Sequence, residues 1–304
     1  MAVAVIEQID RLRTRLSTAR RDGLTIGLVP TMGALHAGHL ELMRQARRHD
    51  DLVVVSIFVN PLQFDRRDDL ERYPRTLDAD VAACQSAGVD IVFAPSAAEM
   101  YPAEPLSTVQ VGRIVDRLCG QFRQGHFTGV ATVVMKLLQI VQPDAAYFGE
   151  KDAQQLAVVR RMVADLNVPV SIVPVPTVRD SDGLALSSRN QRLSGEERPL
   201  AIALYRALQA LQSIVAAGET DSATALNHAT ATIPRDDRLR LEYLEIVDEQ
   251  DFQPVERITA PAIAAGALWV GQTRLIDNVR LLPPIDVRLL PPIDRVRLVP
   301  PSQS

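Results

Sequence analysis

The sequence lacks the features that mark several common classes of protein. It has no run of about 18 apolar residues, which a transmembrane helix requires, and its N-terminus does not have the basic-then-apolar order of a signal peptide. The net charge of −4 argues against binding nucleic acid through a basic surface. The two cysteines, Cys84 and Cys119, form no C-x-x-C pair. We therefore expect reduced, buried thiols in a cytoplasmic protein rather than a metal site or a disulfide.

Lysine is scarce as well. The chain has 33 lysines and arginines, and only Lys136 and Lys151 are lysines. We interpret this as a coding bias towards arginine. Lys151 stands where a helix is expected to start, and a cation there opposes the helix dipole. A role on a phosphate would explain the choice of lysine at this position.

The remaining residues follow a pattern typical of an α/β fold with a doubly wound parallel sheet. Short apolar runs alternate with helical patterns, as expected when helices cover both faces of the sheet. The expected strands lie within residues 24–30, 51–60, 89–95, 144–149 and 170–178. The expected helices lie at about residues 4–21, 38–49, 76–88, 129–141 and 151–166. In such sheets, ligands bind beyond the carboxyl ends of the strands.

Composition shifts near residue 183, so we expect one domain over residues 1–183 and a second, smaller α+β domain over residues 184–279. In the second domain, Ser194 and Glu197 match a capping box that starts a helical region reaching to about residue 233. The segments LRLEYLEIVD and ALWVGQTRLID are each typical of a strand. Residues 280–304 repeat RLLPPID, and paired prolines favour a disordered tail over a docking peptide.

The stretch LVPTMGALHAGHLELM, residues 28–43, joins an expected strand to an expected helix. Gly33 and Gly38 lack a Cβ, so backbone N–H groups there can approach a ligand closely. The helix that follows directs its positive end to the same place. His36 and His39 are three residues apart and can present both rings on one side of the first turn. This arrangement suits a polyphosphate, whereas a zinc site would need further ligands at metal spacing. The plainer alternative is a strand-turn-helix corner with two surface histidines, because a four-residue motif also recurs by chance.

Polar side chains follow three other expected strands. Asn60 and Gln63 come after the second strand, and residues 149–152, Gly-Glu-Lys-Asp, come after the fourth. Ser187, Ser188 and Arg189 follow the last strand and could form a phosphate clamp. Each feature has a plainer alternative, namely a turn amide, acids at a helix N-terminus or a polar linker. If all of these alternatives held, unrelated polar residues would have to occur by coincidence at the ligand-binding edge of one sheet.

Several longer motifs occur in order over about residues 24–278. They are PTMGALHAGH, SIFVNPLQF, YPRTLDAD, GHFTGVATVVMKLL, FGEKDAQQL, PTVRDSDGLALSSRN and TRLIDN. These motifs resemble those of the pantoate–β-alanine ligase family, and the resemblance implies a Rossmann-like nucleotidyltransferase fold. H-x-G-H alone would indicate only the wider nucleotidyltransferase superfamily. The resemblance implies that residues 1–183 bind nucleotide and pantoate, and that residues 184–279 act as a lid.

The resemblance also implies a reaction in two steps. The carboxylate of (R)-pantoate attacks the α-phosphorus of ATP, which gives pantoyl adenylate and pyrophosphate. The amine of β-alanine then attacks the acyl carbon, which gives pantothenate and AMP. The implied cofactor is Mg²⁺, held mainly by the ATP phosphates, with its direct protein ligands unknown. The implied partners are these small molecules and a second copy of the chain in a homodimer, with neither nucleic acid nor membrane.

The resemblance assigns roles to individual residues of this sequence. His36, His39, Lys151 and Arg189 are the implied catalytic residues, because they would stabilise charge as pyrophosphate leaves. The implied ATP-binding residues are Pro30, Thr31, Met32, Gly33, His36, His39, Gly149, Glu150, Lys151, Asp152, Val178, Leu186, Ser187, Ser188 and Arg189. The implied pantoate-binding residues are Gln63, Gln155 and Asn60, and Gln63 is also implied for β-alanine.

Some features depart from the family pattern or fall outside it. Leu186 stands where the family commonly has methionine, a change that nearly keeps volume and polarity. The repeated tail is not a family feature. We expect a structural role for His126 and a core position for Trp269. Two rival functions are a nucleotidyltransferase acting on a phosphorylated substrate and a nucleotide sensor that binds ATP without turnover.

Overall fold

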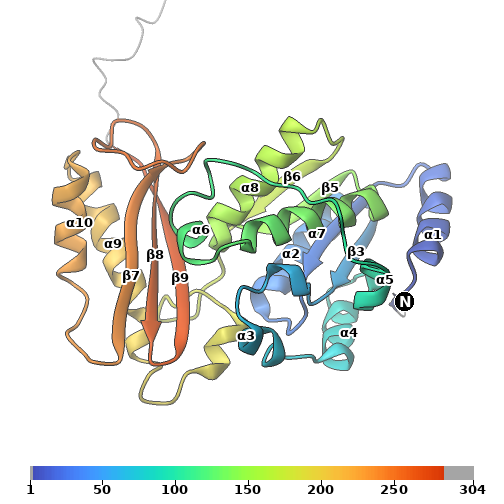
Figure 1. The fold of residues 1–304 in the computed structure, drawn as a ribbon, viewed down its shortest axis with the longest axis horizontal. Coiled ribbons are helices and arrows are strands. Elements are labelled where there is room, and N and C mark those ends of the chain that lie inside the picture. Colours follow the sequence, from blue (N-terminus) through green and yellow to red (C-terminus); the bar gives the residue numbers. More distant parts are fainter. Residues whose placement is uncertain (1–2, 284–304) are drawn as a thin grey trace, which may run out of the picture.

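The computed structural model describes residues 3–283. Two sheets organise the chain, a larger parallel sheet and a smaller antiparallel one (Figure 1). Among the described residues, every helix is too short or too polar to cross a lipid bilayer. Residues 280–304 were expected to form a disordered tail. From residue 284 onwards, this segment lies outside the described residues.

The larger sheet and its helices account for residues 4–175. Its strands are β1 (Ala4–Ile6), β2 (Ile26–Thr31), β3 (Leu52–Ile57), β4 (Ile91–Phe93), β5 (Ala145–Gly149) and β6 (Ser171–Val175). Its main helices are α1 (Ile9–Arg21), α2 (Ala37–His49), α4 (Leu77–Ser86), α7 (His126–Val141) and α8 (Ala153–Asp165). Shorter helical segments are η1 (Pro61–Gln63), α3 (Arg67–Glu71), α5 (Ala97–Met100), α6 (Cys119–Phe122) and η2 (Glu150–Asp152). The expected strands over residues 24–178 are therefore confirmed as β2 to β6.

Side chains on the two faces of the parallel sheet pack into separate cores. Val54 of β3 belongs to a core with buried residues of α1, α7 and α8. Its neighbours Val53 and Val55 belong to a second core with buried residues of α2 and α4. This alternation follows from the two-residue period of a strand. It confirms the doubly wound arrangement, with helices on both faces.

The N-terminus differs from the prediction of one helix over residues 4–21. Residues 4–6 form β1, an edge strand parallel to β4, and the helix α1 starts only at residue 9. Val5 pairs with Val92 yet remains 45% exposed. A three-residue strand carries too short a pattern to be distinguished from a helix start, so the sequence alone could not reveal it.

The strand order is β1-β4-β3-β2-β5-β6, and all neighbouring strands are parallel. The chain moves from β2 outwards through β3 and β4, then returns to place β5 on the other side of β2. The order therefore reverses between β2 and β5. Doubly wound sheets bind ligands in the crevice at such a reversal.

The smaller sheet has the order β7-β8-β9, with both pairs antiparallel. Its strands are β7 (Leu239–Asp248), β8 (Ala262–Val270) and β9 (Thr273–Leu281). Helices α9 (Ala203–Ala216) and α10 (Ser222–Thr230) lie together on its outer side (Figure 1). The short segments η3 (Ser188–Arg192) and η4 (Leu200–Ile202) precede α9.

Three predictions for this region need correction. The segment ALWVGQTRLID spans a hairpin between β8 and β9, turned at Gly271, which has a φ of +55°. The capping-box hydrogen bonds between Ser194 and Glu197 are present, but the α-helix begins later, at Ala203. Strand β9 continues to Leu281, two residues into the segment expected as a tail.

Candidate functional site

A cavity of about 240 Å³ lies where the strand order of the larger sheet reverses. The carboxyl ends of β2, β5 and β6 contribute to its lining. The predicted ATP-binding residues that line it are Pro30, Thr31, Met32, His36, His39, Gly149, Lys151, Asp152, Val178, Leu186, Ser187, Ser188 and Arg189. The predicted pantoate residues Gln63 and Gln155 line it too. Motifs far apart in the sequence thus meet in one space.

Three predicted site residues do not line this cavity. Gly33 is buried in the turn beneath it. Glu150 is exposed, and Asn60 is 1% exposed and faces other residues. The side chains of Glu150 and Asn60 therefore lie outside this cavity, and their part in binding a ligand stays a prediction.

His36 and His39 are fixed at the start of α2 by backbone hydrogen bonds. The N–H of Gly38 donates to His36 Nδ1 at 3.2 Å, and the N–H of His36 donates to His39 Nδ1 at 3.3 Å. A Cβ at Gly38 would lie 2.9 Å from His36 Cε1, so the glycine leaves room for the ring. Because a backbone N–H can only donate, each Nδ1 carries a lone pair. In the neutral ring, the proton therefore sits on Nε2.

The surroundings of His36 and His39 favour the neutral form of both rings at pH 7. Burial lowers the pKa of His39 to about 3, and the neighbouring His36 acts in the same direction. Burial and the nearby Lys151 lower the pKa of His36 to about 4. The two ring centroids are 4.1 Å apart, so two charged rings would repel each other. The site thus offers two neutral Nε2–H donors.

Asp80 holds the turn between β2 and α2 in place. Its carboxylate, 3% exposed, accepts hydrogen bonds from the N–H groups of Ala34 at 3.0 Å and Leu35 at 2.8 Å. Gly33 and Ala34 have φ angles of +79° and +50°, which ordinary residues seldom adopt. The charge-assisted bonds stabilise this backbone. Asp80 lies in the motif YPRTLDAD, but nothing in the sequence pattern indicated this role.

Gln63 presents an amide N–H to the cavity because Asn60 fixes its orientation. Asn60 Oδ1 accepts from the N–H of Leu62 and from the hydroxyl of Tyr101, so its Nδ2 is the donor side. That Nδ2 donates to Gln63 Oε1 at 3.1 Å. Gln63 Nε2 therefore points the other way, towards Met32 Sδ. The hydrogen bond from Asn60 therefore fixes the orientation of the Gln63 amide.

His126 has the structural role expected from the sequence, and it supports Gln63. Its Nδ1–H donates to the carbonyl of Gln63 at 2.7 Å, and its Nε2 accepts from Arg123 at 3.2 Å. Burial, together with the charge of Arg123, lowers the pKa of His126 to about 4. Arg123 in turn pairs with Asp65 at 2.9 Å. Arg123 lines the cavity, a position that was not predicted from the sequence.

Lys151 and Arg189 bring positive charge to the cavity lining beside Asp152. Burial opposes the ionisation of Asp152, but the charges of Lys151 and Arg189 outweigh it and hold the pKa of this carboxyl below its ordinary value. Arg189 also pairs with Asp69 of α3 at 3.0 Å. Arg192 contacts the same carboxylate at 3.0 Å. Asp69 thus links α3 to η3 across the cavity edge.

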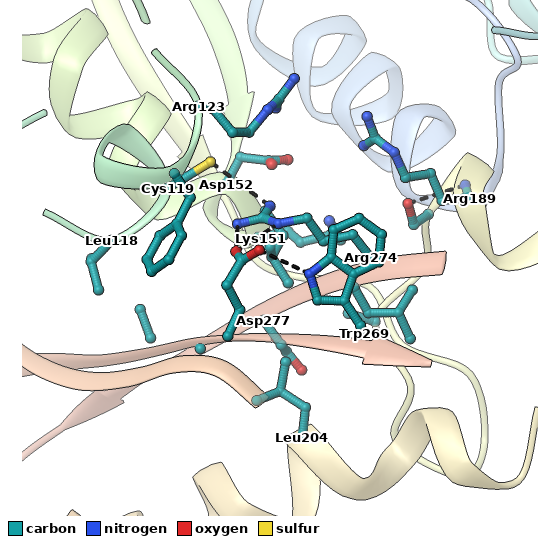
Figure 2. A pocket seen from close by; sticks show the side chains of 18 of the residues that line it. Leu118, Cys119, Arg123, Lys151, Asp152, Arg189, Leu204, Trp269, Arg274 and Asp277 are labelled. Atoms are coloured by element: carbon teal, nitrogen blue, oxygen red, sulfur yellow. Dashed lines mark hydrogen bonds and ion pairs between the residues drawn. The ribbon is translucent and has the colours of Figure 1, made fainter. Parts of the chain in front are cut away.

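A second cavity of about 250 Å³ lies beside the first, between the two sheets. Both cavities are lined by Arg123, His126, Lys151, Asp152, Gln155, Ser187 and Arg189. Figure 2 shows Arg123, Lys151 and Asp152 facing Arg274 and Trp269 of the smaller sheet across this space. Glu242 accepts from Trp269 Nε1 and Arg274 Nε, both at 2.8 Å, so these side chains form a fixed wall.

Two further observations concern metals and thiols. Nowhere in residues 3–283 do three His, Cys, Asp or Glu side chains converge as ligands for a metal ion. Cys84 and Cys119 are buried and have no disulfide partner among the described residues.

Comparison with known proteins shows the family to which the chain belongs. The family model described as "Pantoate-beta-alanine ligase" matches residues 4–280. The chain belongs to this family. Among curated relatives of the family, pantothenate synthetase from Moorella thermoacetica is 50% identical over 91% of this chain and 98% of its own length. The bifunctional pantoate ligase/cytidylate kinase of Thermosynechococcus vestitus is 55% identical over 89% of this chain. This chain spans 53% of that longer relative.

Solved structures of the family show the same fold. Pantothenate synthetase from Thermus thermophilus superposes with a TM-score of 0.88 at 47% identity, covering 92% of this chain and all of that one. The pantoate–β-alanine ligase of Francisella tularensis, complexed with "Beta-gamma ATP and Beta-alanine", gives a TM-score of 0.74 at 33% identity. That comparison covers 91% of this chain and 97% of the other.

Proposed function

We propose that this protein condenses (R)-pantoate with β-alanine, using ATP and releasing AMP and pyrophosphate through a pantoyl adenylate. One observation carries the proposal. Residues from four separate motifs, including His39, Gln63, Lys151 and Arg189, line a single cavity at the strand-order reversal of the sheet. Membership of the pantoate–β-alanine ligase family supports the same conclusion.

The first step requires charge neutralisation at the triphosphate. Negative charge accumulates on the β-phosphate as the bond to the α-phosphorus breaks. Neutral His36 and His39 would each donate an Nε2–H, while Lys151 and Arg189 would supply positive charge. Groups fixed in advance in a cavity stabilise such charge without reorganising. The histidines thus act as hydrogen-bond donors, and no protein nucleophile is required.

Pantoate would lie between the two glutamines. The Nε2–H of Gln63 is directed into the cavity, and Gln155 stands on the first turn of α8. Val133 and Val134 of α7 add apolar wall, which suits the methyl groups of a branched hydroxy acid. Arg123 on the same wall is paired with Asp65, so the two glutamine amides favour a small hydroxy acid over a phosphorylated substrate.

In the second step, the amine of β-alanine would attack the acyl carbon of the adenylate, with Gln63 near both reactants. AMP leaves as the amide bond forms. Water must be excluded, because an exposed acyl adenylate hydrolyses. We propose that residues 184–279 act as a lid on a domain formed by residues 1–183, and that Ser187, Ser188 and Arg189 close on the phosphates.

Mg²⁺ fits this site as an ion carried by the nucleotide. It keeps several waters and commonly binds through substrate phosphates. When bound to ATP, it would neutralise phosphate charge, in addition to the side chains described above. Free thiols are consistent with a cytoplasmic protein, and assembly as a homodimer is an expectation that light scattering in solution would test.

A single assay separates this function from its rivals. Purified protein receives ATP, pantoate carrying ¹⁸O in its carboxylate, and β-alanine. The proposed ligase makes pantothenate, and its AMP contains one ¹⁸O from pantoate. A nucleotidyltransferase acting on another substrate would ignore β-alanine, and a sensor would make no AMP. AMP without ¹⁸O would rule out attack by the pantoate carboxylate.

A further inference from the structure

One side chain of the smaller sheet contacts the backbone of the turn that carries Lys151. Asn278, in β9, donates from Nδ2 to the carbonyl of Glu150 at 2.9 Å and to the carbonyl of Lys151 at 2.8 Å. The turn, η2, follows β5 of the larger sheet. Both hydrogens of a single amide are therefore committed to two consecutive carbonyls in the other part of the molecule.

The position of Asn278 is itself fixed by an ion pair. Its neighbour Asp277 is 6% exposed and accepts two hydrogen bonds from Arg179, at 2.6 and 2.9 Å. Asp277 Oδ1 also accepts from the N–H of Asn278 at 2.8 Å. Arg179 stacks on the ring of Tyr205 at 3.9 Å. This network ties the segment that follows β6, the smaller sheet and Asn278 into one unit.

The geometry points to Asn278 as a positioning residue for Lys151. Because Lys151 lines both cavities, a shift of its backbone moves its ammonium group relative to the triphosphate. We propose that Asn278 sets that backbone position, so that the placement of the smaller sheet determines whether Lys151 can stabilise the leaving pyrophosphate. This inference rests on the proposed function, which puts Lys151 on a phosphate.

A double-mutant cycle tests the inference. Pyrophosphate release in single turnover, with saturating ATP and pantoate, is compared for wild type, Asn278→Ala, Lys151→Ala and the double variant. We expect Asn278→Ala to slow release about 10- to 100-fold, the loss associated with a displaced catalytic group. The KM for pantoate should change less than about twofold. In the Lys151→Ala background, Asn278→Ala should have almost no further effect, because groups that act as a unit are not additive.

Gln212→Ala is the matched control. Gln212 also donates a side-chain amide to a backbone carbonyl of β9, that of Arg280 at 3.0 Å, but it lines neither cavity. It should adenylate at the wild-type rate. Asn278→Asp keeps the shape of the side chain without its donors, and it should be as slow as Asn278→Ala. Melting temperatures establish that each variant is folded.

The possible outcomes are distinct. An Asn278→Ala variant that matches wild type, while Lys151→Ala is slow, would overturn the positioning role and leave the proposed function standing. Equal slowing by Asn278→Ala in both backgrounds would also overturn it, because that result indicates general support of the fold. A wild-type rate for Lys151→Ala would remove the phosphate role of Lys151 itself, and the inference with it.

Discussion

Asp80 makes a sharp test of how the histidine turn is held. Replacing Asp80 with asparagine keeps the size of the side chain but changes one carboxylate oxygen to an NH₂ group. In the protein, one oxygen accepts from Leu35 N–H at 2.8 Å, and the other accepts from Ala34 N–H at 3.0 Å and from the Thr76 hydroxyl. Whichever way the new amide is turned, one backbone N–H faces another donor.

The structure sets the size of the expected effect. A hydrogen bond to a charged group contributes about 1.5–3 kcal/mol, and an unsatisfied buried donor costs about 1–3 kcal/mol. Asp80→Asn loses one such bond and leaves one donor unpaired. Because the turn can relax, we expect the free energy of unfolding to fall by about 2–4 kcal/mol. Released from Asp80, the turn would misplace both imidazoles, and adenylation should slow roughly 100-fold.

Two measurements on the same preparations check this expectation. Urea unfolding gives the stability, and pyrophosphate release with ATP and pantoate gives the adenylation rate. Asp78→Asn, an exposed aspartate on the same helix, is the control and should change neither. If Asp80→Asn loses stability but adenylates like wild type, the turn does not need this conformation and the reasoning is wrong.

Three further variants probe other parts of the site. A Cβ on Gly129 would lie 2.2 Å from a backbone oxygen of η1. Gly129→Ala should therefore displace Gln63 and raise the pantoate KM about tenfold or more, while the ATP KM changes little. Unchanged pantoate kinetics would contradict this prediction. Asp69→Asn should lower the ATP KM several-fold, because the carboxylate competes with phosphate for Arg189; a raised KM would show instead that Asp69 aligns the guanidinium. Burial lowers the pKa of His39 to about 3, so the folded protein favours the neutral ring. The resulting contribution to stability is complete above pH 6.5, the ordinary pKa of histidine. This contribution is lost as the pH falls from 6.5 towards 3. Urea unfolding from pH 7.5 to 5 should therefore show a smaller loss in His39→Gln than in wild type, and equal losses would refute the shifted pKa.

Local patterns in the sequence were enough to predict the main strands and the residues at their ends. Val53, Val54 and Val55 form a continuous apolar run because both faces of the sheet are covered. The glycines and histidines of the turn after β2 stood out by their spacing, and the resemblance to the family gave them a role. These features depend on residues that are neighbours in the chain, which is why the sequence reveals them.

The parts that were missed depend on contacts between distant residues. The pairing of β5 with β2 brings the turn bearing Lys151 next to the histidines, and nothing in the sequence indicates that pairing. Asp80 reaches a turn 45 residues away, and Asn278 reaches a turn 127 residues away. Asn60 was grouped with the pantoate-binding residues, and only the structure shows that its amide bonds to Gln63 and to the backbone of Gly129. Burial decides such roles, and burial is a property of the fold.

The most direct test is a crystal structure of the protein with pantoate and an ATP analogue that cannot release pyrophosphate. We predict that the triphosphate accepts hydrogen bonds from His36 and His39 Nε2, Lys151 Nζ and the Arg189 guanidinium, at about 3 Å each. The pantoate carboxylate should lie beside the α-phosphorus, within reach of Gln63. A triphosphate bound away from these four side chains would contradict the account.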